Sequence, residues 1–351
     1  MTLSTEIQSN YKHIFANDPI VVQAVTTAAD VPVNATLPQL VLRITANGHT
    51  HEIPQQFVPG DTLRTDISSA LQAEYQLIDR QSEPTPNLTS HTYTAFSAKI
   101  EAYVRYLING TEYNGTPSTV MDGIYVLRGG LSSYLRHSFA TSPSAAVQAV
   151  AARLTTKPAM VEVGGSRRIL EVKNVGDTQL ISSYNTSTHV VSTTATAVTA
   201  QTSPSSDIPI IEDDDHRHQI VFRNSLGVLE TFSVKNLKKK ILTVNSEQYP
   251  VLSTPSYSPT LNILTEAEPV ADSVEMSTGY MPREWVEWFV CEVLTATYAW
   301  MSFPLLDPKT GGTTFTYLPV HLEPEEKNIV IDETQPQIGE VKFVVKTSQI
   351  K

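Results

Sequence analysis

The sequence predicts a mainly β protein, built as two β-sandwich-like or β-barrel-like domains with a few short helices. Runs of β-branched and aromatic residues recur along the chain and are bounded by Asn, Gly, Asp or Pro, which is typical of strands. Helical periodicity is confined to three short segments. No repeat of about twenty to fifty residues is visible, which argues against a solenoid or a propeller. A chain of 351 residues is long enough for two ordinary domains.

The first half of the chain is dominated by strand-like runs. They are Pro19 to Val25, Leu40 to Thr45 and Ile100 to Ile108, each rich in β-branched or aromatic residues. Runs of this composition, bounded by Asn, Gly, Asp or Pro, favour antiparallel pairing. We expect these runs to form the sheet of an N-terminal β-rich domain over residues 1–165.

Two helices are expected within this domain. The segment Asp66 to Tyr75 opens with a capping residue, and Ile67, Leu71 and Tyr75 follow one another at intervals of four, so that they share one helical face. The segment Pro143 to Leu154 begins with a proline, which suits the first turn of a helix. The first of these helices is expected to cover one end of the sheet.

The middle of the chain is predicted to connect two domains. Residues 166–207 combine short strand-like runs with the segment Ser182 to Ser206, which consists largely of Ser, Thr, Ala and Val. Such a composition can form strands but offers little apolar bulk to bury. We therefore expect an exposed Thr/Ser-rich ribbon, followed by a C-terminal β-rich domain over residues 208–351.

The C-terminal domain begins with a predicted hairpin. The segment His218 to Val234 places turn-forming residues, Asn224 to Gly227, between two runs of alternating apolar residues. The alternation predicts one buried face, formed by Ile220, Phe222, Val228, Phe232 and Val234.

One amphipathic helix and a last strand are predicted further on. Over residues 282–297, Trp285, Trp288, Phe289 and Val293 form an apolar stripe, which is more typical of a core than of a ligand site. The closing run Glu340 to Thr347 alternates apolar and basic residues. We expect it to be a strand with a partly exposed face and an edge open to a partner.

Charge and composition exclude several classes of function. A formal net charge of −11 argues against nucleic-acid binding, and the basic run Lys235 to Lys240 is interpreted as a solvated turn or strand end. No stretch approaches the roughly 20 apolar residues that a membrane helix needs, so no membrane insertion is expected. Met1 to Ile20 lacks the pattern of a secretory signal peptide. The single cysteine, Cys291, is expected to be a buried, inert thiol.

Candidate chemical motifs favour structural interpretations. The cluster Glu212 to His218 contains carboxylates and imidazoles, but consecutive residues of an extended chain point to opposite sides, which favours an acidic linker over a metal site. Gly129 and Gly130 lack the rest of a phosphate-binding motif and are expected to make a tight turn. Gly311 and Gly312 suit a hairpin loop. The sequence thus nominates no catalytic residue, no cofactor or cofactor-binding residue and no metal ligand.

Several segments together resemble a known class of proteins. They are, in chain order, Phe15 to Val25, Thr65 to Tyr75, Tyr125 to Arg136, Leu154 to Pro158, Ile220 to Val234 and Ser277 to Met301. This series resembles tail-associated structural proteins that are encoded by phages and prophages of gut Bacteroidota. The Thr-rich segment in the middle of the chain matches no motif of that class.

The resemblance implies a non-enzymatic structural component of a phage virion, associated with the tail, the tail tip or the baseplate. Such a protein would be assembled in the host cytoplasm and would contact other copies of itself, other virion tail proteins, and a host-surface glycan or protein. An alternative is a cell-surface carbohydrate-binding or adhesin protein of a Bacteroidota bacterium, which would also be β-rich and acidic. A polysaccharide-degrading tail spike is a third interpretation, although such enzymes usually show long β-helix repeats.

Overall fold

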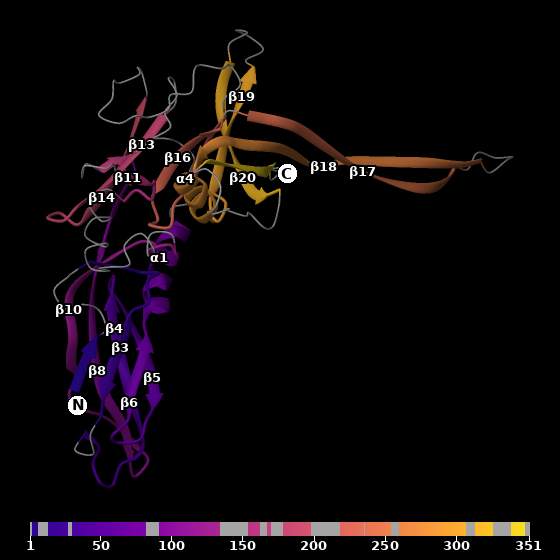
Figure 1. Ribbon diagram of the computed structural model, residues 1–351. Helices are drawn as coiled ribbons and strands as arrows, with labels where there is room; N and C mark the ends of the chain where they lie inside the picture. The colour runs from indigo at the N-terminus through magenta and orange to yellow at the C-terminus, as the bar shows by residue number, and fades with distance from the viewer. Residues whose placement is uncertain are drawn as a thin grey trace. The chain divides into compact units, whose positions relative to one another are not determined.

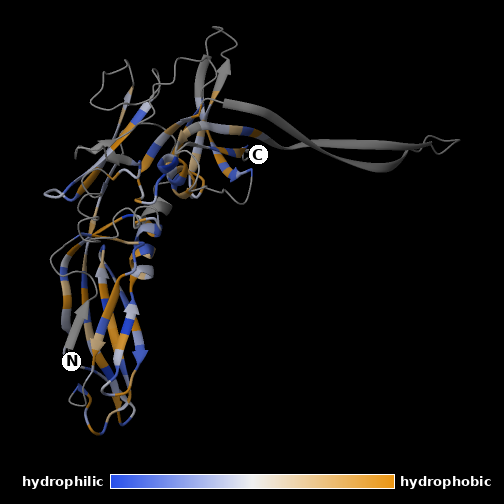
Figure 2. Ribbon diagram, viewed as in Figure 1, coloured by the Kyte–Doolittle hydropathy of each residue, from blue (hydrophilic) through white to orange (hydrophobic). Residues whose placement is uncertain are grey.

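A computed structural model of the protein confirms the predicted fold class, because it is mainly β with several sheets and a few short helices (Figure 1). Along the strands, apolar and polar residues alternate in many places, as expected for sheets with one buried face (Figure 2). The structure describes residues 2–5, 13–26, 30–81, 91–133, 154–161, 167–169, 178–197, 218–234, 236–253, 260–306, 313–325 and 338–347.

The contacts divide the chain into two compact units. Unit 1 contains Met1–Thr156, Leu180–Thr196 and Asn224–Leu229, and unit 2 contains Lys157–Gln179, Ala197–Arg223 and Glu230–Lys351. Each unit is therefore assembled from segments that are distant in the sequence. The sequence-based boundaries, 1–165, 166–207 and 208–351, stay a prediction about the domains.

Unit 1 contains a six-stranded sheet with the order β2-β10-β8-β4-β5, in which β9 pairs with β8. A three-stranded sheet has the order β1-β3-β6. The strands predicted near residues 19–25, 40–45 and 100–108 are confirmed as β3, β4 and β8. The bounds are β1 Thr2–Thr5, β2 His13–Phe15, β3 Val21–Val25, β4 Thr36–Ala46, β5 His49–Gln56, β6 Thr62–Asp66, β8 Phe96–Ile108, β9 Thr111–Asn114 and β10 Ser118–Leu127.

The first predicted helix is confirmed as α1, Ser68–Gln81, which is longer than expected. Its start is fixed by Asp66, whose Oδ1 accepts hydrogen bonds from the backbone N–H groups of Ser68, at 2.9 Å, and Ile20, at 3.1 Å. The expected face is buried, since Ile67, Leu71 and Tyr75 belong to the main core together with residues of β3, β4, β8 and β10. The helix therefore covers the sheet as predicted.

The second predicted helix, Pro143 to Leu154, lies outside the described residues except for Leu154. That residue is buried with a left-handed φ of 50° and belongs to a smaller core cluster of unit 1. The same cluster contains Phe15, Leu127, Leu226 and Val228.

The Thr-rich segment is folded where the structure describes it, so the expected exposed ribbon is wrong there. β13, Thr178–Asn185, and β14, Val190–Ala197, form a three-stranded sheet with β7, His91–Thr94. Alternate residues of both β13 and β14 are buried. The buried hydroxyls of Ser182 and Thr193 hydrogen-bond to each other at 2.7 Å, so these polar side chains satisfy one another inside the fold.

Gly129 and Gly130 allow a close approach of two backbones within unit 1. The backbone N–H of Gly130 donates to the carbonyl of Ser225 at 2.8 Å, and Gly129 has a φ of +79°. A Cβ atom on Gly129 would lie 2.2 Å from that same Ser225 oxygen. The glycines thus serve the tight turn that the sequence predicted rather than a phosphate-binding loop.

Unit 2 is built on a seven-stranded sheet with the order β16-β15-β19-β20-β21-β18-β17. Unit 2 also contains a separate two-stranded sheet, β11-β12. The predicted hairpin is confirmed as β15 and β16, but nearly every residue of both strands is buried rather than every second one. The bounds are β11 Ala159–Val161, β12 Arg167–Ile169, β15 His218–Arg223, β16 Leu229–Val234, β17 Asn236–Ser253, β18 Thr260–Pro282, β19 Ala299–Leu306, β20 Thr313–Pro324 and β21 Ile338–Thr347.

The predicted C-terminal helix is shorter than expected. It consists of α4, Arg283–Trp288, and one π-helical turn, η2, Phe289–Val293. The predicted stripe is confirmed as core, because Trp285 is only 2% exposed and the other three members are fully buried. The ring of Trp285 packs edge-on against Trp288 at 5.1 Å, and Phe289 lies 5.2 Å from Phe343 of β21.

The closing strand is not an edge, which corrects the sequence-based expectation. β21 lies between β20 and β18 and pairs antiparallel with both. Alternation correctly indicated a strand, but it cannot reveal how many neighbours a strand has. Its residues Val341, Phe343 and Val345 are buried in the core of unit 2.

Candidate functional site

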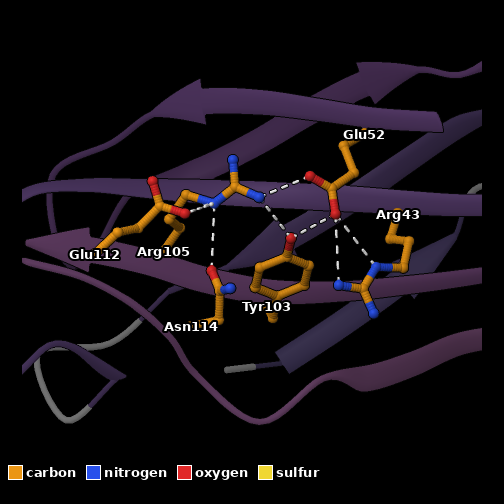
Figure 3. A network of polar contacts seen from close by, with 6 residues as sticks. All are labelled: Arg43, Glu52, Tyr103, Arg105, Glu112 and Asn114. Carbon is orange, nitrogen blue, oxygen red and sulfur yellow. Dashed lines mark hydrogen bonds and ion pairs between the residues drawn. The ribbon is translucent and has the colours of Figure 1, made fainter. Parts of the chain in front are cut away.

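The outer face of the unit 1 sheet carries a network of polar side chains (Figure 3). Arg43 comes from β4, Glu52 from β5, and Tyr103 and Arg105 from β8. Antiparallel pairing sets Arg43 beside Glu52, while Tyr103 and Arg105 lie two residues apart on the same face of β8. The opposite face of these strands is apolar core, so alternation alone directs the polar side chains outward.

Glu52 is the centre of this network. Its Oε1 accepts the hydroxyl hydrogen of Tyr103 at 2.7 Å, and its Oε2 lies 2.6 Å from Nη2 of Arg105. Arg43 approaches the same carboxylate at 3.4 Å and lies over the Tyr103 ring, 4.7 Å from its centre. The hydrogen bonds from Tyr103 and Arg105 hold the pKa of Glu52 below its usual value. The carboxylate is therefore ionised and fully engaged at neutral pH.

The network continues onto β9. Nε of Arg105 lies 3.2 Å from Oδ1 of Asn114 and 3.3 Å from the carboxylate of Glu112. Arg105 thereby links three strands through one guanidinium group. Two arginines and two glutamates of this network are paired with one another, so the arrangement ties the four strands together on this face of the sheet.

A second polar cluster joins β5 to α1. Glu74 of α1 is fully buried, and its two carboxylate oxygens lie 2.8 Å from Nδ1 of His49 and 2.5 Å from Nε2 of His51. Burial alone would raise the pKa of Glu74, but the hydrogen bonds from the two histidines outweigh it and hold that pKa below its usual value. Each imidazole points a nitrogen at the carboxylate, so the cluster is a hydrogen-bonded clasp between helix and sheet.

Neither cluster has the arrangement of a metal centre. Among the described residues, no group of three or more His, Cys, Asp or Glu side chains is placed to hold a metal ion. Within the same part of the chain, no helix is both long and apolar enough to cross a membrane.

The most distinctive feature of unit 2 is a long two-stranded extension of its sheet, which we call the arm (Figure 1). β17 and β18 pair antiparallel from Asn236↔Ser277 to Ser253↔Thr260. β21 pairs with β18 only from Ser273 onward. The arm is therefore Leu242–Ser253 with Thr260–Asp272, which pair only with each other among the described strands, over roughly 35 Å at about 3.3 Å per residue.

Two edges of the extension are open within the described structure. The outer edge of β17 is an end of the seven-stranded sheet, and β18 has a second open edge along the arm, where β21 has ended. The opposite end of the sheet differs, because all six residues of β16 are buried. The arm is thus a place where both strands of the sheet present unpaired backbone groups.

The charges in this region are segregated along the sequence. The start of β17 carries Lys238, Lys239 and Lys240. The arm contains Glu247, Glu266, Glu268 and Asp272 and no Lys or Arg. The base of the extension is thus basic in sequence, and the arm is acidic.

The structure does not bring the sequence-predicted motifs together into a site. Glu212 to Arg217 and the pair Gly311 and Gly312 lie outside the described residues. His218 is buried in β15, and its Nδ1 lies 2.8 Å from the carbonyl oxygen of Ser302. Cys291 is a half-buried thiol in the π-helical turn, more exposed than we expected.

Comparison of the chain with models of known protein families, with curated proteins and with solved structures finds no match.

Proposed function

We propose that this protein is a non-enzymatic structural component of a phage virion, associated with the tail, the tail tip or the baseplate, and that it acts through oligomeric assembly. The arm carries this proposal. A hairpin with only two strands is at best marginally stable in water, because it has no third strand or packed face to support it. An arm of this length therefore favours a protein whose partners complete its sheet.

Two further observations agree with an assembly role. The arm keeps both of its edges open among the described strands, and open edges are the usual route by which one chain adds strands to another. The polar networks of unit 1 are internally paired and serve to stiffen the sheet, as a scaffold requires. The resemblance to tail-associated proteins supplies the setting, a virion assembled in the host cytoplasm.

Purified particles from a host that produces this protein would test the proposal. We expect peptides of the chain to co-purify with the particles in stoichiometric amounts, and imaging to place its density on the tail. The expected number of copies per particle is one that a cyclic symmetry around the tail allows. Detection of the protein on the bacterial surface, with none in particles, would favour the adhesin alternative instead.

A further inference from the structure

We propose that the arm of one copy adds to the sheet of the next copy, with the open edge of β18 in the arm pairing antiparallel with the basal part of β17. This inference rests on the proposed function and names the partner as a second copy of this chain. The contact joins two different edges, so it is heterologous, and repetition of such a contact closes into a ring when the rotation between copies allows it.

The availability of the edges leads to this pairing. β18 is open only along Thr260–Asp272, because β21 covers it from Ser273 onward. β17 is open along its whole outer edge. Among the described strands of unit 2, β20 is also open along Thr313–Pro319, because β21 pairs with it only from Val320 onward, but that stretch carries no charged residue. The edge strand at the other end of the sheet, β16, is buried throughout.

The distribution of charge selects the base of β17 as the partner of the arm. The open stretch of β18 contains Glu266, Glu268 and Asp272, and the base of β17 contains three consecutive lysines, Lys238 to Lys240. Opposite charges on neighbouring strands stabilise a pair, whereas like charges placed opposite each other destabilise it. If the arms of two copies paired edge to edge instead, acidic residues would face acidic residues. The chain as a whole is acidic, so this local basic segment attracts the acidic arm of another copy specifically.

The register within the arm also favours pairing of β18 with a basic strand. Glu247 pairs with Glu266 across the hairpin, which places two acidic residues opposite each other at one position. An isolated hairpin is weakened by such a pair. A basic strand added beside β18 would offset that repulsion, so the arm gains more from association than an uncharged ribbon would.

Charge reversal on the full chain tests the inference. In sedimentation velocity at low salt, wild type is expected to form multimers. The acidic-strand variant, Glu266→Lys with Glu268→Lys, is expected to associate at least about tenfold more weakly, because like charges would then meet across the contact. The basic-strand variant, Lys238→Glu with Lys240→Glu, should show the same loss. Lys239 is left unchanged in this variant because it already pairs with Glu275 across the hairpin.

Mixing provides the control for misfolding. The two variants carry complementary reversed charges, so a mixture in equal amounts should regain association that neither shows alone. The matched control, Glu284→Lys with Glu325→Lys, changes the net charge by the same amount as the acidic-strand variant. Its two positions are exposed and lie outside the arm, so it should associate as wild type does.

A disulfide tests the pairing itself. With Cys291 replaced by Ser, a chain carrying Lys240→Cys and Glu268→Cys should form a ladder of covalently linked copies on oxidation, and each single variant should not. Within one chain, residue 240 pairs with Val274 and residue 268 with Asn245, so the two thiols lie about 17 Å apart and cannot join.

The inference is overturned if wild type is a monomer, if both variants associate as wild type does, or if no ladder forms. If any of these holds while the protein is still found in purified particles, the proposed function stands and only this contact is wrong. Absence of the protein from particles overturns the proposed function.

Discussion

The hydroxyl of Tyr103 donates a hydrogen bond to Oε1 of Glu52 over 2.7 Å, although the two residues are 51 positions apart in the sequence. Tyr103 is only 1% exposed although it belongs to the outer face, and the guanidinium groups of Arg43 and Arg105 lie over its ring, 4.7 and 5.8 Å from the ring centre. The hydrogen bond ties β5 to β8 across the intervening β4. It also anchors the carboxylate that the two arginines share.

Removal of this hydroxyl should weaken unit 1. We expect Tyr103→Phe to lower the free energy of unfolding by about 1 to 2 kcal/mol, since the bond is made to a charged group that keeps its contact with Arg105. Chemical denaturation of the full chain measures the change. Tyr113→Phe is the matched control, because Tyr113 is exposed and its ring can still stack on Tyr106. If both substitutions change the free energy of unfolding equally, the Tyr103 hydroxyl does not stabilise unit 1 as proposed.

The clasp of Glu74 with His49 and His51 predicts a pH dependence. The pKa of Glu74 is lower in the folded protein than its usual value, so the carboxylate contributes stability above that usual value and loses it as the pH falls through the folded pKa. We expect Glu74→Gln to destabilise the protein by roughly 1 to 3 kcal/mol at pH 7. The difference between wild type and the variant should shrink as the pH falls into the acidic range. A difference that stays constant with pH would contradict the assigned clasp.

Two glycines in left-handed conformations should respond differently to alanine. Gly129 and Gly123 have φ values of +79° and +66°, but only Gly129 faces a backbone atom where a Cβ would stand. We expect Gly123→Ala to cost about 1 to 2 kcal/mol and Gly129→Ala roughly 2 to 5 kcal/mol. Thermal unfolding of both variants compares them directly. Similar losses would mean that the contact with Ser225 relaxes at little cost.

The buried tryptophan stripe should dominate the stability of unit 2. We expect Trp285→Ala to lower the free energy of unfolding by about 3 to 5 kcal/mol, as truncation of a large buried aromatic residue does. Glu284→Ala, at the exposed position beside it, serves as the control and should change stability by less than about 0.5 kcal/mol. A loss below about 1 kcal/mol for Trp285→Ala would show that the stripe is not a packed core.

Local periodicity made part of this fold predictable. The face of α1 and the Trp285 stripe both recur at helical spacing, and helix geometry alone decides which residues share such a face. The Thr-rich strands misled the prediction, because Ser182 and Thr193 satisfy each other only once β13 and β14 are paired. The polar network was missed for the same reason, since its residues meet only through the register of four strands.

The arm was also missed, and its prolines explain why. Pro250 and Pro269 lie inside β17 and β18, although a proline usually argues against a strand because it cannot donate to the ladder. Proline is tolerated on edge strands, and in the arm each strand has one open edge. The sequence therefore showed a proline-interrupted, acidic stretch where the structure has a continuous ribbon.

Deletion of the arm tests the central claim, that the arm joins copies of this protein to one another, most directly. Ile241 and Ser273 are partners across the hairpin, so an Asn-Gly turn can replace Leu242–Asp272 and close the remaining strands. The measurement is the mass of the full chain and of this shortened chain in solution. We predict multimers for the full chain and monomers for the shortened one, with the same unfolding midpoint for the remaining fold. A full chain that is monomeric, or two chains that form the same multimers, would contradict the account.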